Sequence, residues 1–177
     1  KEQPREYYIM NIASAFYYPN RMGRIILESM EEVVGRNGLN AVLNLAGLGE
    51  LIGNYPPSDK NPEFLFETVS GMMEKLEQAY GPHGGRGLAV RVGRSSFKYG
   101  MREFGQQMGL TETAFRLLPL GTKLRLGGQA LADVFNKETD QRVRIEERDG
   151  KLLLHIERCP LCWGRHTSEV VCHLAVG

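Results

Sequence analysis

The stretch QRVRIEERDGKLLLHIER, residues 141–158, decides the fold class of this chain. Apolar and polar residues alternate on both sides of the dipeptide Asp149-Gly150, the pattern of strands that each bury one face. Asp-Gly favours the tight type I′ turn, because both of its residues tolerate a positive φ. The sequence therefore predicts two antiparallel strands joined by a two-residue turn, and these strands lead directly into a cysteine-rich segment at residues 158–173.

Upstream of this hairpin, the sequence predicts mainly helices. In residues 20–38, Met, Ile and Val recur at helical spacing after Asn20, a residue type suited to an N-cap. Residues 41–53 are apolar and predict a second, shorter helix. The clearest helix covers residues 62–81, because an apolar stripe follows Asn61 as N-cap and ends at a glycine.

The middle of the chain predicts shorter elements. GPHGGRG, residues 81–87, predicts a loop, and GLAVRVG, residues 87–93, predicts a short strand. SSFKYGMREFGQQMG, residues 95–109, predicts a helix that begins at a serine cap. A further helix is expected over residues 117–135, although two adjacent glycines in its middle disfavour helix and suggest close packing there.

Neither an internal repeat nor a long linker is recognised in the sequence. A chain of 177 residues is long enough for one ordinary core and short for two. We therefore expect one α+β domain, residues 1–177, in which helices pack on an antiparallel sheet.

The balance of charge excludes a global attraction to nucleic acid or to an anionic membrane. The chain has 22 Lys and Arg and 21 Asp and Glu, which gives a formal net charge of +1. Its apolar runs are shorter than the roughly 18 residues that would indicate a membrane span. Residues 1–8 lack the pattern of a signal peptide, so we expect a soluble, cytoplasmic protein.

All three cysteines lie in the segment RCPLCWGRHTSEVVCH. Cys159 and Cys162 have the two-residue spacing that lets two thiolates bind one ion, and Cys172 supplies a third sulfur. His166 or His173 is the expected fourth ligand of a structural zinc site. The alternatives are an iron–sulfur cluster, a redox pair, or reduced thiols that pack without a metal. A nucleic-acid-binding knuckle is not expected, because the segment has no excess of basic residues.

Methionine and aromatic residues suggest an adaptable apolar cavity, although they equally suit an ordinary core. The chain contains 7 Met and 7 Phe, many of them on predicted helix faces. The candidate cavity residues are Phe64, Phe66, Met72, Met73, Phe97, Met101, Phe104 and Phe115. No GxSxG elbow, HExxH helix or paired-carboxylate signature is present, so no catalytic residue is proposed and the chain is not expected to be an enzyme.

Several motifs in this order resemble the 4-vinyl reductase domain family, also called hydrocarbon-binding domains. They are PNRMGRIILESMEEVVGRNG, YPPSD, YGPHGGRGLAVRVGR, FRLLPL and RCPLCWGR followed by CH. The resemblance implies a TRAPP-like α+β fold, a homodimer, and an apolar cavity that binds or senses a small hydrophobic ligand. Aromatic-sensing relatives hold zinc through one upstream cysteine, which Cys172 resembles, and through a later cysteine segment. That later segment has no counterpart before Gly177, so the resemblance implies that the C-terminal part of the family domain is missing.

The same resemblance leaves two other functions open. One is a tetrapyrrole-binding role in bacteriochlorophyll biosynthesis, as a component of a 4-vinyl reductase-like oxidoreductase. Reduction would then need an external electron donor, because the sequence contains no recognisable nicotinamide or flavin motif. The other is a scaffold or assembly subunit of TRAPP type, which would expose a large apolar helix face.

Overall fold

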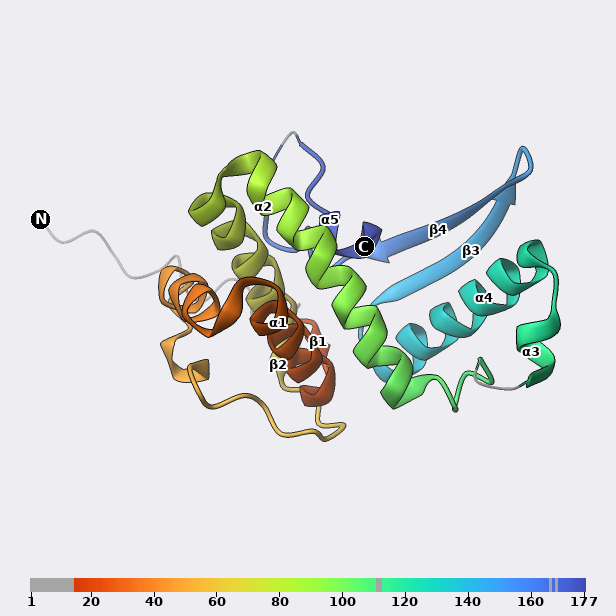
Figure 1. The fold of residues 1–177 in the computed structure, drawn as a ribbon, viewed down its shortest axis with the longest axis horizontal. Helices are drawn as coiled ribbons and strands as arrows, with labels where there is room; N and C mark the ends of the chain where they lie inside the picture. Colours follow the sequence, from red (N-terminus) through yellow and green to blue (C-terminus); the bar gives the residue numbers. More distant parts are fainter. Residues whose placement is uncertain (1–14, 111–112, 166, 168) are drawn as a thin grey trace, which may run out of the picture.

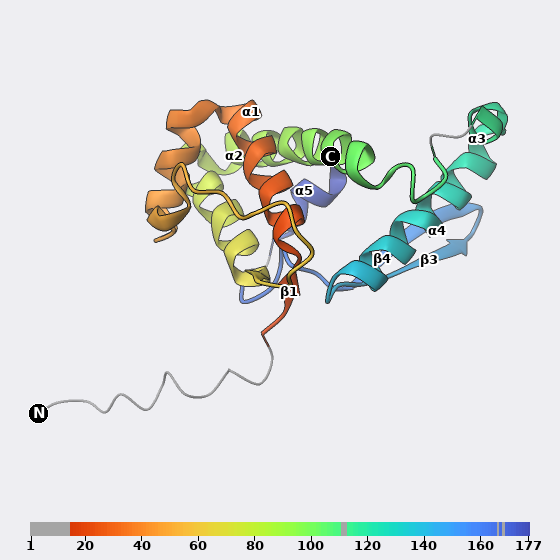
Figure 2. The same ribbon diagram turned by 90° about the horizontal axis from the view of Figure 1, so that it is seen from below.

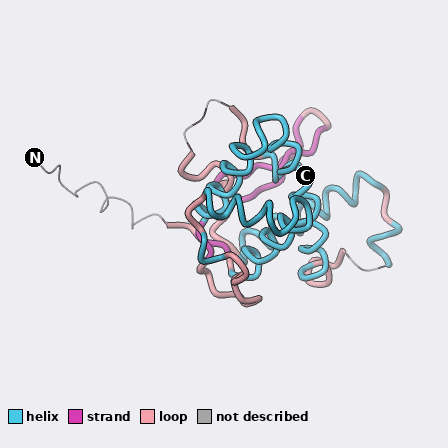
Figure 3. The backbone as a smooth tube through the Cα atoms, turned by 60° about the vertical axis from the view of Figure 1, so that its left-hand side comes forward, coloured by secondary structure: helices cyan, strands magenta, loops and turns pink. Residues whose placement is uncertain are grey.

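Two long helices pack side by side, and a β-hairpin extends away from them with a third long helix along it (Figure 1). This computed structural model describes residues 15–110, 113–165, 167 and 169–177. The elements in chain order are β1 (Tyr17–Tyr18), α1 (Asn20–Leu45), the 3-10 helix η3 (Gly49–Leu51), β2 (Phe64–Leu65), α2 (Phe66–Phe104), α3 (Thr113–Leu117), α4 (Leu120–Glu138), β3 (Arg142–Arg148), β4 (Lys151–Arg158) and α5 (His173–Val176). Helix dominates the backbone (Figure 3).

The main core lies between α1 and α2, each of which directly follows a two-residue strand. The two strands pair antiparallel, with Tyr17 opposite Leu65 and Tyr18 opposite Phe64. This pairing brings the starts of both helices together, so their apolar stripes face each other. The largest fully buried side chains of this core are Leu27, Met30, Leu39, Val42, Leu43, Phe66, Val69, Met72, Met73, Leu76 and Val92.

Both long helices bend at a glycine with a positive φ. Gly35 in α1 has φ 75° and ψ 164°, and Gly81 in α2 has φ 75° and ψ 162°. Glycine adopts this backbone conformation without the steric cost that a Cβ atom would impose. Equal numbers of residues separate each glycine from the start of its helix, at Asn20 and Phe66.

The two bends belong to an internal repeat, which inspection of the sequence alone missed. IILESMEEVVGRNG, residues 25–38, aligns without gaps with GMMEKLEQAYGPHG, residues 71–84. Identical residues occupy the aligned pairs Glu28 and Glu74, Glu31 and Glu77, Gly35 and Gly81, and Gly38 and Gly84. Buried side chains also correspond, namely Ile26 with Met72, Leu27 with Met73, and Met30 with Leu76. The body therefore consists of two strand–helix–glycine–helix units related by the pairing of β1 with β2.

The predicted loop at residues 81–87 and the predicted strand at residues 87–93 are wrong, because α2 continues through both. Pro82 directly follows the bend, where a helix segment begins and where a proline costs no hydrogen bond. Beyond it, small buried residues recur at helical spacing and form a narrow stripe. They are Gly85, Ala89, Val92 and Gly93.

Both predicted asparagine caps are also wrong. α1 has Pro19 at its N-cap, while α2 begins after Leu65, and Asn61 lies in the loop before β2. The Asn20 side-chain amide donates instead to Asp59 at 3.0 Å and to Glu63 at 2.7 Å, which fixes this loop against α1. The predicted second helix over residues 41–53 is partly right, since α1 runs to Leu45 and a 3-10 turn follows.

The predicted hairpin is confirmed. β3 and β4 pair antiparallel, and Asp149 and Gly150 form the turn with φ values of 52° and 70°. α4 lies along this hairpin (Figure 2), where Gly128 lets the helix approach Ile145 closely. The chain is thus a mixed helix and strand domain, as expected, but its strands form two separate two-stranded sheets.

β1 ties the helical body to the segment between α4 and β3. The Tyr17 N–H donates to the Asp140 carboxylate at 2.9 Å, and the Asp140 N–H donates to the Tyr17 carbonyl at 3.2 Å. Nearby, the Arg21 guanidinium pairs with Glu138 at 2.6 Å. These contacts fix the hairpin and α4 relative to α1. Within the described residues, no helix has the length and apolar character of a membrane span.

Glu32 joins α1 to α2 and gives a pH-dependent prediction. Hydrogen bonds from Lys98, Ser95 and Tyr99 lower the pKa of Glu32 to about 2. Because the folded pKa lies below the unfolded pKa, this contribution is present above about pH 4.5 and is lost as the pH falls towards 2. We expect Glu32→Gln to lower the melting temperature by a few degrees at pH 7, with the difference shrinking between pH 4.5 and pH 2.

The control is Glu103→Gln, because Glu103 is exposed on α2 and has no ion pair among the described residues. Calorimetric scans of the three proteins across this pH range give the measurement. A Glu32→Gln difference that stays constant down to pH 2 would contradict the assignment.

Candidate functional site: an apolar pocket beside a thiol cluster

A pocket of about 410 Å³ lies where the second half of α2, α4, the hairpin and α5 meet, within the described residues. α2 contributes seven residues to its lining, including Gly100, Met101 and Phe104. The turn after β4 contributes Cys159, Pro160 and Leu161, and α5 contributes a further wall. Several elements form this pocket together. Its shape therefore depends on how the hairpin and α5 pack against the helical body.

The pocket wall is apolar and uncharged. None of the described residues that line it is Asp, Glu, Lys, Arg or His. Its polar groups include the Tyr18 hydroxyl, which donates to the Gln141 side-chain oxygen at 2.7 Å, and the buried Ser96 hydroxyl, which has no partner among the described residues. Burial, together with the nearby Cys159, raises the pKa of Tyr18, so the phenol stays protonated. Such a wall favours neutral ligands, since a charged group would lose its hydration without gaining a partner.

The candidate cavity residues divide between the pocket and the core. Phe97, Met101 and Phe104 line the pocket, all from the second half of α2. Phe115 lies on α3, where its ring faces Gly127. The other four pack in the main core, where each is at most 5% exposed, namely Phe64, Phe66, Met72 and Met73.

Sequence reasoning missed the part of the wall that comes from β1, from α1 and from the residue before β3. Tyr18 and Gln141 are far apart in the chain, and neither belongs to a motif. Met22, Ile25 and Ile26 had been assigned to an amphipathic helix, but spacing alone does not say which neighbour they face. In the structure these three residues line the pocket.

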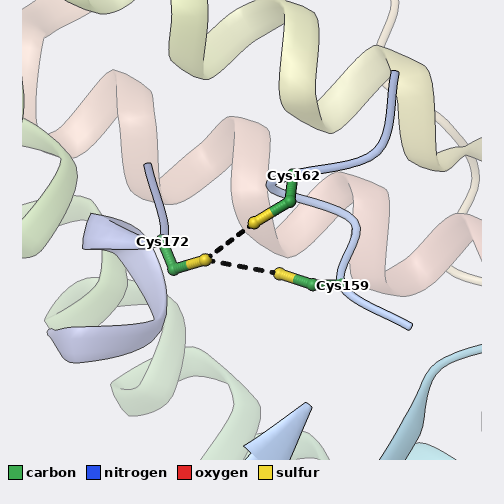
Figure 4. A group of neighbouring side chains, drawn as sticks. All are labelled: Cys159, Cys162 and Cys172. Carbon is green, nitrogen blue, oxygen red and sulfur yellow. Dashed lines mark hydrogen bonds between the residues drawn. The ribbon is translucent and has the colours of Figure 1, made fainter. Parts of the chain in front are cut away.

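The side chains of the three cysteines point toward one another (Figure 4), and one of them, Cys159, also lines the pocket. Cys159 and Cys162 come from the turn after β4, while Cys172 directly precedes α5. The Cys172 sulfur lies 2.9 Å from that of Cys162 and 3.7 Å from that of Cys159, and all three sulfurs lie within 4.8 Å of one another. The turn is closed by the Cys162 N–H, which donates to the Cys159 carbonyl at 3.3 Å.

This geometry suits a thiophilic cation. Zinc–sulfur bonds of about 2.3 Å in a tetrahedron separate two sulfurs by about 3.8 Å, close to the distance between Cys159 and Cys172. The pair Cys162 and Cys172 is closer, so a bound cation requires these two sulfurs to move apart. Burial raises the pKa of both the Cys159 and the Cys172 thiols, so these two sulfurs are protonated at neutral pH until a cation displaces the protons.

One of the two expected fourth ligands, His173, does not join the described group of sulfurs. His166 lies outside the described residues. His173 opens α5, but its ring nitrogens are not among the ligand atoms that gather within 4.8 Å. Its Nε2 atom is buried and has no hydrogen-bond partner among the described residues. Among the described residues, the three cysteine sulfurs are therefore the candidate metal ligands that the structure brings together.

No family model, curated protein or solved structure matches this chain. The function is therefore inferred from the pocket and the thiol cluster. The two share Cys159, which offers a sulfur to the cluster and also lines the pocket.

Proposed function

We propose that this chain binds a small, neutral, apolar molecule in the pocket between α2, α4, the hairpin and α5. The observation that carries this proposal is a pocket of about 410 Å³ whose described lining carries no charged residue. Small-molecule sites commonly measure roughly 300–1,000 Å³ and are mostly apolar, with a few polar groups that orient the ligand. Tyr18 and Gln141 are the polar groups that would do so here.

The proposal agrees with the resemblance to hydrocarbon-binding domains, which implies a TRAPP-like fold around an apolar cavity. We also propose that the cation held by the three cysteines is zinc in a structural role, since thiolate ligands suit it and zinc has no redox chemistry. Ligand binding would change conformation or association between copies of the chain, rather than drive a reaction.

Gly100 offers a direct test, because it lines the pocket and has open space where a side chain would project. We expect Gly100→Leu to fill this space and to weaken binding of the fluorescent probe N-phenyl-1-naphthylamine by about tenfold or more. The measurement is a fluorescence titration of the probe into each protein.

Gly87→Leu is the matched control, because Gly87 lies on the same helix, is exposed, and also has open space around it. Both substitutions gain about the same helix propensity, so only occupation of the pocket separates them. Equal saturable binding of the probe by the two variants would refute the proposed site. The absence of saturable binding by the unsubstituted protein would also refute it. A visible absorbance band in the purified protein would instead favour a tetrapyrrole ligand.

A further inference from the structure

We infer that metal binding by Cys159, Cys162 and Cys172 sets the affinity of the pocket for its ligand. This inference rests on the proposed function and concerns the regulation of the same site. Its basis is that the thiol cluster joins two separate segments of the pocket wall, the turn after β4 and α5.

The first wall segment lies inside the metal-binding turn. Pro160 and Leu161 stand between Cys159 and Cys162, and Cys159, Pro160 and Leu161 all line the pocket. Pro160 and Leu161 are buried, so this turn is a packed part of the wall. A cation held by the two flanking sulfurs would therefore fix the position of residues that face the ligand.

The second wall segment is α5, which begins directly after Cys172. Residues 174–177 all line the pocket. α5 has only four residues, and helices this short are not stable on their own. It lies against Gly93 of α2, whose missing side chain leaves room for the Leu174 carbonyl.

α5 packs against α2, and the segment that leads to α5 adds further contacts with the same helix. The described residues of the segment between Trp163 and Val171 are exposed, except for Arg165. Two ion pairs anchor it to α2, Arg86 with Glu169 and Arg165 with Glu77. These contacts run to α2, whereas metal–thiolate bonds to the turn and to Cys172 would join the two wall segments directly to each other.

Binding energies of the metal and the ligand are therefore coupled, because each stabilises the same arrangement of the wall. The coupling is reciprocal: the factor by which zinc raises ligand affinity equals the factor by which ligand raises zinc affinity. We expect a factor of about ten, within the usual range for coupled sites.

The experiment titrates N-phenyl-1-naphthylamine into the full chain, loaded with zinc or stripped by a chelator, well below the melting temperature. Zinc-loaded protein is expected to bind the probe about tenfold more tightly than stripped protein. The reciprocal titration, by competition with a chromogenic zinc chelator, is expected to show the same factor when the probe is present. Circular dichroism shows whether the stripped protein stays folded. If it does, a metal that merely prevents unfolding would not change the probe affinity and the zinc affinity by equal factors.

Cys162→Ser provides the matched variant, because Cys162 is exposed and serine keeps its shape. This variant is expected to bind the probe like stripped protein, and the chelator is expected to have no effect on it. Equal probe affinity with and without zinc, in a protein that binds zinc, would overturn the inference and leave the proposed pocket intact. Failure to bind zinc would also overturn it. Absence of saturable probe binding in both states would refute the proposed function and this inference together.

Discussion

Replacement of Phe66 by alanine is expected to lower the free energy of unfolding by about 3–5 kcal/mol. Phe66 is fully buried at the start of α2. Its ring lies 5.0 Å from that of Tyr18 and 6.0 Å from that of Phe16, measured between centroids. Alanine would leave a cavity between the two helical units, where strand pairing holds the backbone and limits collapse. Chemical denaturation gives the free energy directly.

Phe97→Ala is the matched control, because this ring is 56% exposed and lines the pocket rather than the core. We expect it to cost less than about 1 kcal/mol of stability, as most exposed substitutions do, and to weaken probe binding. The pair thus separates core from pocket. Comparable losses of stability in the two variants would show that Phe66 is not the core residue described here.

Gly23→Ala is expected to destabilise the protein by about 1–3 kcal/mol, although alanine is the better helix former. Gly23 lies in the first turn of α1, where a Cβ atom would overlap the ring of Phe64. Phe64 is 5% exposed, so its ring has little room to move away. α1 would have to shift from β2 to relieve the overlap, and this would disturb the pairing of β1 with β2.

Gly71→Ala is the control for this effect, because Gly71 lies in α2 and has open space around its Cα. Alanine there is expected to raise stability by roughly 0.5–1 kcal/mol through helix propensity alone. The two alanine substitutions therefore have opposite signs, and thermal or chemical unfolding measures both. Stabilisation by Gly23→Ala would show that α1 and β2 are not packed as closely as described.

Local signals predicted those parts of the fold that local interactions determine. Asp149 and Gly150 form a turn wherever alternating strands flank them, so the hairpin followed from the sequence. Gly81 and Pro82 usually end a helix, yet here a second helical segment starts immediately after the bend. In residues 87–93, apolar and polar residues alternate over too short a run to distinguish a strand from a helix. Helix forms here, and its stripe of small residues packs against α5.

The candidate site was predictable to a similar extent. The spacing of Cys159, Cys162 and Cys172 indicated a shared ion, and the three sulfurs do meet. The pocket was harder to predict, because its wall combines parts of the chain that lie far apart in the sequence, from β1 to α5. Phe66 and Met101 are both large apolar residues, and composition alone made both of them candidates for the cavity. Only the tertiary arrangement places Phe66 in the core and Met101 in the pocket.

The contact between β1 and the segment before β3 has a consequence for biosynthesis. Tyr18 leaves the ribosome long before Gln141, the residue to which its hydroxyl donates. At about 5–20 residues per second, this partner emerges roughly 6–25 s later. The two helical units have time to assemble first, because their contacts lie close together in the chain. The pocket is thus completed only once α5 has also been synthesised.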